Sequence, residues 1–88
     1  SATDKLVRWG GEEFIVFCPE TEAGEAQIKA EKIRLLVSQH LWVHGDPLTC
    51  SIGIAEMKQE RVTETIARAD EALYQAKHSG RNQVILSH

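Results

Sequence analysis

Two adjacent carboxylates follow two adjacent glycines near the start of the chain, in the order Gly10, Gly11, Glu12 and Glu13. Short apolar runs rich in β-formers flank this group, so the pattern predicts a β-hairpin with both acids at its tip. Adjacent glycines can adopt the positive φ values of a tight primed turn, and they leave the backbone open to close approach by a ligand. Successive strand residues point to opposite faces, so we expect the carboxylates to diverge, which would leave one of them free to bind a metal ion.

Two cations four positions apart, Lys77 and Arg81, lie near the other end of the chain. Lys77 falls in the last turn of an expected helix, and Arg81 lies just beyond it, after Gly80. Cations at this place stabilise a helix by their interaction with its C-terminal dipole. Helix capping is therefore the simplest interpretation of the pair when it is considered alone.

The chain has the size and composition of one small globular domain, with 88 residues of which 42% are hydrophobic and 26% charged. Its formal net charge of −3 disfavours sequence-independent binding of bulk DNA or RNA, which usually requires a basic protein. No apolar run is long enough to span a membrane, and the N-terminus lacks the apolar core of a secretory signal. The composition thus favours a cytoplasmic chain with no membrane anchor in this segment.

Neither Cys18 nor Cys50 belongs to a Cys-x-x-Cys pair. Each lies in an apolar, strand-like run, so we expect buried free thiols in a reducing cytoplasm, with a disulfide as the alternative that the sequence leaves open. The histidines show no zinc-ligand spacing with one another or with the cysteines. They are interpreted as surface or structural residues.

Periodicity along the chain predicts six elements in the order ββαβαβ. After the two strands of the hairpin, apolar residues at three- and four-residue steps indicate an amphipathic helix over about residues 22–40, with Thr21 as its N-cap. A turn is expected at residues 45–47, and a second amphipathic helix begins near Val62 and ends just before Gly80. The last few residues, from about position 82, are expected to form the final strand.

Residues 48–55 predict a core strand between the two helices. Leu48, Cys50, Ile52 and Ile54 alternate with small residues, so one face of the strand is apolar and the other would let a helix pack closely. Hairpins mixed with helices favour an α+β sandwich in which the helices pack on a mainly antiparallel sheet.

Three separated segments of the chain together resemble the GGDEF family of diguanylate cyclases. They are residues 8–14 (Arg-Trp-Gly-Gly-Glu-Glu-Phe), residues 51–55 (Ser-Ile-Gly-Ile-Ala) and residues 70–84, which begin Asp-Glu-Ala-Leu-Tyr-Gln-Ala-Lys and continue His-Ser-Gly-Arg-Asn-Gln-Val. The resemblance extends over essentially the whole chain, but it corresponds to about the C-terminal half of a usual family domain. Residues 1–88 are therefore interpreted as the C-terminal portion of a single GGDEF domain, with the ferredoxin-like palm of nucleotide cyclases.

The resemblance implies an enzyme of second-messenger signalling that joins two GTP molecules into cyclic di-GMP and releases pyrophosphate. Each 3′-hydroxyl attacks the α-phosphorus of the other nucleotide, and each domain holds one GTP, so a homodimer of the full domain is needed for catalysis. The implied cofactor is Mg²⁺ or Mn²⁺, which carboxylates bind and which lowers the pKa of the attacking hydroxyl.

The same resemblance assigns roles to individual residues. Glu12 takes the metal-ligand position, and Glu13 takes that of a second catalytic acid, which organises the metals or stabilises the reacting hydroxyl. The residues expected to contact the nucleotide or its phosphates are Gly10, Gly11, Lys77, Arg81 and Arg8. Phe14, Asp70 and Tyr74 are expected to be structural.

Two departures from the family pattern bear on function. The family's inhibitory site is an Arg-x-x-Asp motif, and here Asp4 is in place but Ser1 stands where the arginine belongs, so we expect no strong product inhibition through this site. The family's further metal-binding Asp, its guanine-reading residues and a central strand belong to the N-terminal half. We therefore expect two groups of strands that face each other across a gap, and no activity of these 88 residues alone.

Two other functions stay open. A non-catalytic relative would bind GTP or cyclic di-GMP as a signalling module, although such receptors usually lose the acids that Glu12 and Glu13 provide here. An unrelated ferredoxin-like interaction domain is the more distant alternative.

Overall fold

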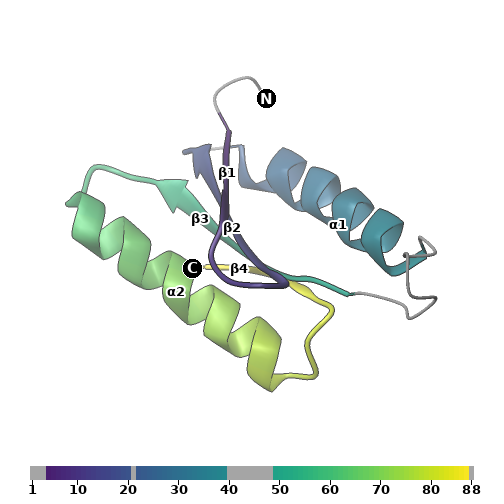
Figure 1. Ribbon diagram of the computed structural model, residues 1–88. Coiled ribbons are helices and arrows are strands. Elements are labelled where there is room, and N and C mark those ends of the chain that lie inside the picture. The colour runs from purple at the N-terminus through teal and green to yellow at the C-terminus, as the bar shows by residue number, and fades with distance from the viewer. Residues whose placement is uncertain (1–3, 21, 40–48, 88) are drawn as a thin grey trace.

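The computed structural model describes residues 4–20, 22–39 and 49–87 of the chain. They form a four-stranded sheet with α1 and α2 on opposite sides of it (Figure 1). The elements are β1 (Lys5–Arg8), β2 (Glu13–Pro19), α1 (Ala23–Gln39), β3 (Ser51–Met57), α2 (Val62–His78) and β4 (Val84–Leu86). This arrangement confirms the predicted α+β class and the order ββαβαβ. The expected N-cap at Thr21, the turn at 45–47 and Leu48 lie outside the described residues.

Two of the three strand pairings in the sheet are parallel. The sheet has the order β1-β2-β3-β4, in which β1 and β2 form the antiparallel hairpin, while β3 pairs in parallel with both β2 and β4. The prediction of a mainly antiparallel sheet is therefore wrong. The physical reason is that α1 and α2 each connect two parallel strands, since a parallel pair needs a crossover connection that a hairpin turn cannot supply.

The sheet is also continuous between the hairpin and the strands that follow it. β2 pairs with β3 along its whole length, from Glu13 opposite Ser51 to Pro19 opposite Met57. The backbone groups of these strands are thereby hydrogen-bonded to each other, and the expected gap between two groups of strands is not present. The edges of the sheet are β1 and β4.

Two apolar clusters hold the helices on the two faces of the sheet. Side chains of β2 and β3 alternate between the faces, and both cysteines are buried free thiols, as predicted. The cluster on the α1 face contains Val16, Cys18, Ala26, Ala30, Cys50, Ile52 and Ile54. The cluster on the α2 face contains Ile15, Ala55, Ala69 and Leu73. Neither α1 nor α2 has the length and apolar character needed to cross a membrane.

Gly53 lets α2 approach β3 closely. A Cβ atom at this position would lie 2.7 Å from the backbone nitrogen of Leu73 and 2.9 Å from the carbonyl oxygen of Ala69. Contacts this short are not tolerated, so the backbone of α2 can lie at this distance only because residue 53 has no side chain. The prediction that the small residues of this strand face a closely packed helix is confirmed. The packing also determines where the C-terminal end of α2 lies relative to the hairpin.

Candidate functional site

The turn of the hairpin is wider than the expected primed turn. Residues 9–12 separate the two strands, and the amides of Trp9 and Gly10 donate to the carbonyl oxygen of Glu13 at 2.7 and 3.3 Å. Among the glycines that the structure describes, only Gly80 has a positive φ, so neither Gly10 nor Gly11 is in the left-handed region. The expected primed turn is therefore wrong, because a connection of this length closes the hairpin without left-handed residues.

Arg8 holds this turn in shape. Its Nε atom donates to the carbonyl oxygens of Gly10 at 3.1 Å and Gly11 at 3.2 Å, and its Nη2 atom donates to Gly11 at 3.0 Å. The guanidinium group thus crosses the turn and binds backbone acceptors that would otherwise face solvent. The expected contact between Arg8 and a nucleotide stays a prediction.

The two carboxylates of the tip have different surroundings, and their expected divergence stays a prediction. Glu13 is half-buried on the α2 face, where its Oε2 atom lies 3.3 Å from the Nζ atom of Lys77. Glu12 is exposed, and its carbonyl oxygen accepts a hydrogen bond of 3.0 Å from the amide of Ser51, which fixes the tip to β3. Burial raises the pKa of the Cys50 thiol in the cluster under α1, against the opposing charge of Arg34 and with smaller contributions from Glu12 and Glu31. Glu13 is therefore paired with a cation on the α2 face, whereas Glu12 is exposed at the tip.

The two glycines of the turn leave different kinds of space. A Cβ atom at Gly10 would lie 3.3 Å from the Oε1 atom of Glu13, whereas one at Gly11 would have no atom within 4 Å. Gly10 thus makes room for the carboxylate of Glu13 beside Lys77. Gly11 leaves the outer side of the turn open, so a ligand can approach the backbone there.

A small pocket of about 100 Å³ lies beside the Glu13–Lys77 pair. Its lining residues are Trp9, Glu13, Asp70, Leu73, Tyr74 and Lys77. Tyr74 is 55% exposed, and its ring stacks on His78 with the centroids 3.8 Å apart, so it is less buried than a scaffold residue should be. The pocket is too small for a nucleotide, whose sites typically exceed about 300 Å³. It can accept a single polar group between the hairpin and α2.

Arg81 lies in a sharply bent segment after α2. Gly80, Arg81 and Asn82 all have positive φ, at 113°, 59° and 50°. The amide of Arg81 donates to the carbonyl oxygen of Ala76 at 2.9 Å, which closes the end of the helix. The left-handed conformation is costly for a residue such as arginine. The side chain of Arg81 is exposed, and the structure does not bring it into contact with Glu12 or Glu13.

Arg34 of α1 fixes this bent segment from the other face of the sheet. Its Nη1 atom donates to Oδ1 of Asn82 at 2.9 Å and to the carbonyl oxygen of Asn82 at 3.4 Å, and the same guanidinium group is paired with Glu31. The sequence analysis did not identify Arg34. The available signal was its position, since it continues the buried stripe of Ala26 and Ala30 at a four-residue step.

The hairpin tip offers a metal ion the carboxylate of Glu12. The residues that the structure describes contain no group of three His, Cys, Asp or Glu side chains that could hold a metal ion. Glu13 is engaged with Lys77, which leaves the exposed carboxylate of Glu12. Because Mg²⁺ is commonly bound by one or two protein carboxylates together with water and substrate phosphates, Glu12 fits as one ligand of such an ion.

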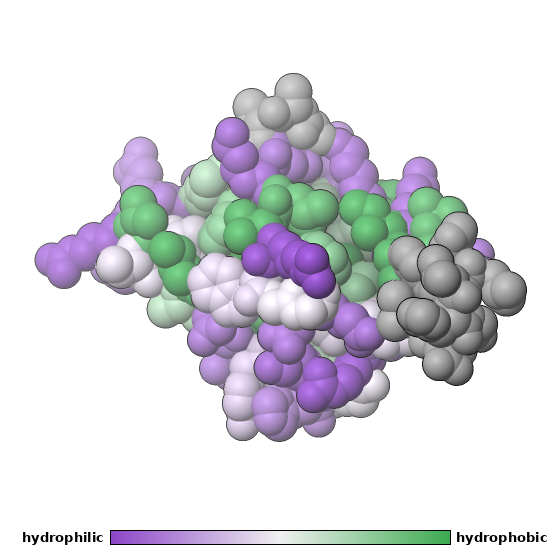
Figure 2. Space-filling model, in the orientation of Figure 1, coloured by the Kyte–Doolittle hydropathy of each residue, from purple (hydrophilic) through white to green (hydrophobic). Residues whose placement is uncertain are grey.

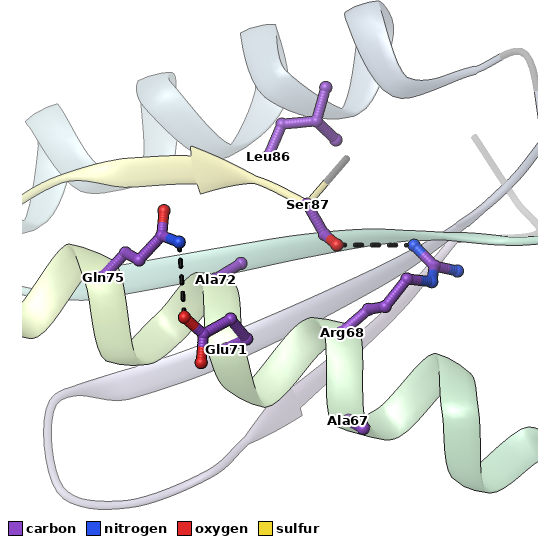
Figure 3. A pocket seen from close by; sticks show the side chains of 7 residues that line it. All are labelled: Ala67, Arg68, Glu71, Ala72, Gln75, Leu86 and Ser87. Carbon is purple, nitrogen blue, oxygen red and sulfur yellow. Dashed lines mark hydrogen bonds between the residues drawn. The ribbon is translucent and has the colours of Figure 1, made fainter.

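A larger pocket of about 370 Å³ lies between α2 and β4 (Figure 3). Its polar side chains bind one another: Gln75 donates to Glu71 at 3.4 Å, and Arg68, which is paired with Glu60, donates to Ser87 at 3.5 Å. Ala67, Ala72 and Leu86 complete the lining. None of the residues expected to bind the metal or the nucleotide lines this pocket, so the hairpin tip is the stronger candidate site.

Asp4, the expected remnant of an inhibitory site, lies just before β1 and is mostly buried. Its Oδ2 atom is 3.9 Å from the Nζ atom of Lys29 on α1. Ser1, which stands where the family's arginine belongs, lies outside the described residues. The expectation of no strong product inhibition stays a prediction.

The chain matches the family model described as "Diguanylate cyclase, GGDEF domain" over residues 1–83. It is 43% identical over 84 residues to the diguanylate cyclase DgcM of Escherichia coli strain K12. The aligned segment covers 93% of the chain and 20% of DgcM. It is 43% identical over 91 residues to the response regulator PleD of Caulobacter vibrioides (96% of the chain, 20% of PleD) and 39% identical over 89 residues to the diguanylate cyclase A of Treponema denticola (96% and 24%). The chain thus spans about a fifth to a quarter of these relatives. On this evidence the chain belongs to the GGDEF family of diguanylate cyclase domains.

Proposed function

We propose that the protein containing this chain condenses two GTP molecules into cyclic di-GMP and pyrophosphate, and that this chain supplies the catalytic hairpin and a phosphate-binding helix end. The observation that carries the proposal is the contact of 3.3 Å between Glu13 at the hairpin tip and Lys77 in the last turn of α2. It unites the two segments that the reaction needs, although they lie at opposite ends of the chain. The family and the names of the relatives support the same activity.

In this proposal, Glu12 binds the metal ion and Glu13 positions Lys77. A bound Mg²⁺ or Mn²⁺ lowers the pKa of the attacking 3′-hydroxyl and offsets charge on the phosphates. The ammonium group of Lys77 has three donors, so it can remain paired with Glu13 while it donates to a phosphate oxygen. Glu13 thereby holds a cation next to the place where negative charge develops.

Gly11 and Arg81 lie on the solvent-exposed sides of the proposed nucleotide site. The turn at Gly11 is unobstructed, so the triphosphate can approach the backbone of the tip. Arg81 is exposed beyond the end of α2, and we assign its guanidinium group to the phosphates as well. Arg8 supports the site by its hydrogen bonds to the carbonyl oxygens of Gly10 and Gly11.

Each domain holds one GTP in this reaction, so two copies of the full domain must meet. The rate per molecule of enzyme should therefore rise with enzyme concentration until the dimer is saturated. With Ser1 at the arginine position, product should not inhibit strongly through Asp4, because the bidentate guanidinium is missing.

The test is an assay of the full-length protein with GTP and either Mg²⁺ or Mn²⁺, in which nucleotides are separated by chromatography. We expect cyclic di-GMP and pyrophosphate, with no product from ATP, and no turnover by the 88 residues alone. Binding of GTP or cyclic di-GMP without turnover by the full-length protein would favour the non-catalytic signalling module instead. If the full-length protein neither binds GTP or cyclic di-GMP nor turns GTP over, the proposal is overturned.

A further inference from the structure

The segment formed by residues 79–83 connects α2 to β4 and contains Arg81 (Figure 1). All of its residues are glycine or polar, and none belongs to either of the two apolar clusters under α1 and α2. Figure 2 shows apolar surface gathered in a band over β1, whereas the surface over α2 below this band is mainly hydrophilic. The conformation of segment 79–83 therefore depends on hydrogen bonds rather than on apolar packing.

Backbone hydrogen bonds fix the two ends of this segment. Near its start, the amide of Arg81 donates to the carbonyl oxygen of Ala76 in α2 at 2.9 Å. At its end, the carbonyl oxygen of Gln83 accepts a hydrogen bond of 2.8 Å from the amide of Ile52 in β3. The path of the chain between these two anchors decides where the side chain of Arg81 lies.

A side chain of α1 holds the segment between the two anchors. Arg81 and Asn82 both have left-handed backbone, with φ of 59° and 50°, which is unfavourable for a residue with a side chain although asparagine tolerates it better than most. Such a conformation persists only where the surrounding structure enforces it. The Nη1 atom of Arg34 does so, because it donates to Oδ1 of Asn82 at 2.9 Å and to the carbonyl oxygen of the same residue at 3.4 Å.

Glu31 orients the guanidinium group of Arg34. The Nε atom of Arg34 donates to Oε1 of Glu31 at 3.0 Å, and its Nη2 atom donates to the same oxygen. The hydrogen bond from Arg34 lowers the pKa of the Glu31 carboxyl group, so the pair stays charged. The side chain of Arg34 is only 15% exposed, and each of its three nitrogen atoms has an acceptor. Arg34 is therefore placed to hold Asn82 rather than to contact a nucleotide itself.

We propose that Arg34 is a positioning residue for phosphate binding, because it holds Asn82 and thereby the left-handed backbone that presents the side chain of Arg81 at the end of α2. The inference rests on the proposed function, in which Arg81 binds the phosphates of GTP. A segment released from Arg34 would present Arg81 correctly only part of the time. The apparent affinity for the nucleotide falls in proportion to the fraction of molecules that are competent to bind.

The test measures binding of 3′-deoxy-GTP with Mg²⁺ to the full-length protein by calorimetry, since a nucleotide without the 3′-hydroxyl cannot be converted to product. The variants are Arg34→Gln, Arg81→Ala, the double variant and Arg68→Gln as the matched control. Arg68 is also a mostly buried arginine, 19% exposed and paired with Glu60, but its hydrogen bonds lie outside segment 79–83. Thermal unfolding of each variant is measured in parallel.

A further variant, Asn82→Gly, removes the hydrogen bond to Arg34 from the other side. Glycine adopts the left-handed backbone without cost, so this variant keeps the fold even if Arg34→Gln does not. It is also combined with Arg81→Ala, which gives a second double variant for the same comparison.

We expect the Kd to rise about tenfold in Arg81→Ala and about three- to tenfold in Arg34→Gln and Asn82→Gly. Neither of the last two should raise the Kd further in the Arg81→Ala background, because residues that act through one contact are not additive. Arg68→Gln should lower the melting temperature but leave the Kd unchanged.

Two outcomes would overturn the inference alone. One is an unchanged Kd in Arg34→Gln and Asn82→Gly although Arg81→Ala binds more weakly. The other is a rise in Kd that is equal with and without the guanidinium group of Arg81, since Arg34 would then act by direct contact or by a general loss of stability. An unchanged Kd in Arg81→Ala would instead overturn the assignment of Arg81 to the phosphates, and the inference with it.

Discussion

The Nζ atom of Lys77 lies 3.3 Å from the Oε2 atom of Glu13. The contact follows from two other features of the fold: β2 pairs in register with β3, and α2 lies against β3 at Gly53. Together they bring the last turn of α2 beside the start of β2. Both side chains are about a quarter exposed, and ion pairs with this much solvent contribute little to stability, on the order of 0–1 kcal/mol. The pair is therefore better suited to positioning Lys77 than to holding the fold together.

Replacing Lys77 tests this interpretation. In the full-length protein we expect Lys77→Ala to weaken GTP binding by about tenfold or more, because a charge-assisted contact contributes roughly 1.5–3 kcal/mol. The melting temperature should change little, since a partly exposed ion pair contributes little to stability. Calorimetry and thermal unfolding measure the two effects, and Lys32→Ala on α1 is the control. Unchanged affinity together with a large loss of stability would show that Lys77 only caps α2.

The carboxylate of Glu12 should be essential for turnover. Glu12→Gln keeps the shape of the side chain but removes the charge that a metal ligand needs. We expect synthesis of cyclic di-GMP to fall by at least about 10²-fold, as for the loss of other transition-state electrostatic contacts. Glu25→Gln, an exposed acid in the first turn of α1, should leave the rate unchanged. Near-normal turnover of Glu12→Gln would contradict the assignment of Glu12 to the metal.

Gly53→Ala should destabilise the protein through the contact between β3 and α2. Its Cβ would meet backbone atoms at 2.7 and 2.9 Å, and backbone cannot move aside as a flexible side chain can. We expect a loss of about 2–3 kcal/mol in the free energy of unfolding. Gly24→Ala in α1 is the control, because nothing lies within 4 Å of its added Cβ, and it should be neutral or stabilising by up to about 0.5 kcal/mol. Chemical unfolding measures both, and equal effects would show that the close approach at Gly53 is not required.

Local patterns predicted those features that depend on neighbours in the sequence. The small residue at position 53 predicted the close approach of a helix, which the structure confirms. The parallel pairing of β2 with β3 depends on which strands meet in space, which periodicity does not encode. The hydrogen bonds between Arg34 and Asn82 join residues of different elements, so only the folded arrangement reveals them. The left-handed backbone at Arg81 is likewise invisible to propensity, because arginine rarely adopts it.

Because the backbone of Arg81 is left-handed, two substitutions can separate the effect of its charge on GTP binding from the effect of its backbone conformation on stability. Arg81→Gly removes the charge and relieves the cost of φ at 59°, whereas Arg81→Ala removes the charge and keeps the cost. We expect both to weaken GTP binding by about tenfold, as expected for the loss of a charge-assisted contact. Only the glycine variant should become more stable, by roughly 0.5–1 kcal/mol. If neither variant changes GTP affinity, the exposed guanidinium group does not reach the phosphates.

The buried thiol of Cys18 should make the protein less stable in alkali. Burial, and then the charges of Asp4, Glu56 and Glu22, raise its pKa from an ordinary value of 9.0 to about 11. Between these two values the unfolded chain loses the thiol proton while the folded chain keeps it, so the unfolded state binds fewer protons and stability falls as pH rises. The slope from one such group is at most about 1.4 kcal/mol per pH unit.

Cys18→Ala isolates this effect, because the variant keeps every other titratable group of the protein. We expect the variant to be less stable than the natural protein at pH 8, through lost packing, but to lose less stability between pH 9 and 11. Urea unfolding at intervals across this range gives the two curves, which should converge as the pH approaches the pKa of the folded thiol, about 11. Parallel curves would mean that Cys18 ionises as readily in the folded protein as in the unfolded one, contrary to its complete burial between β2 and α1.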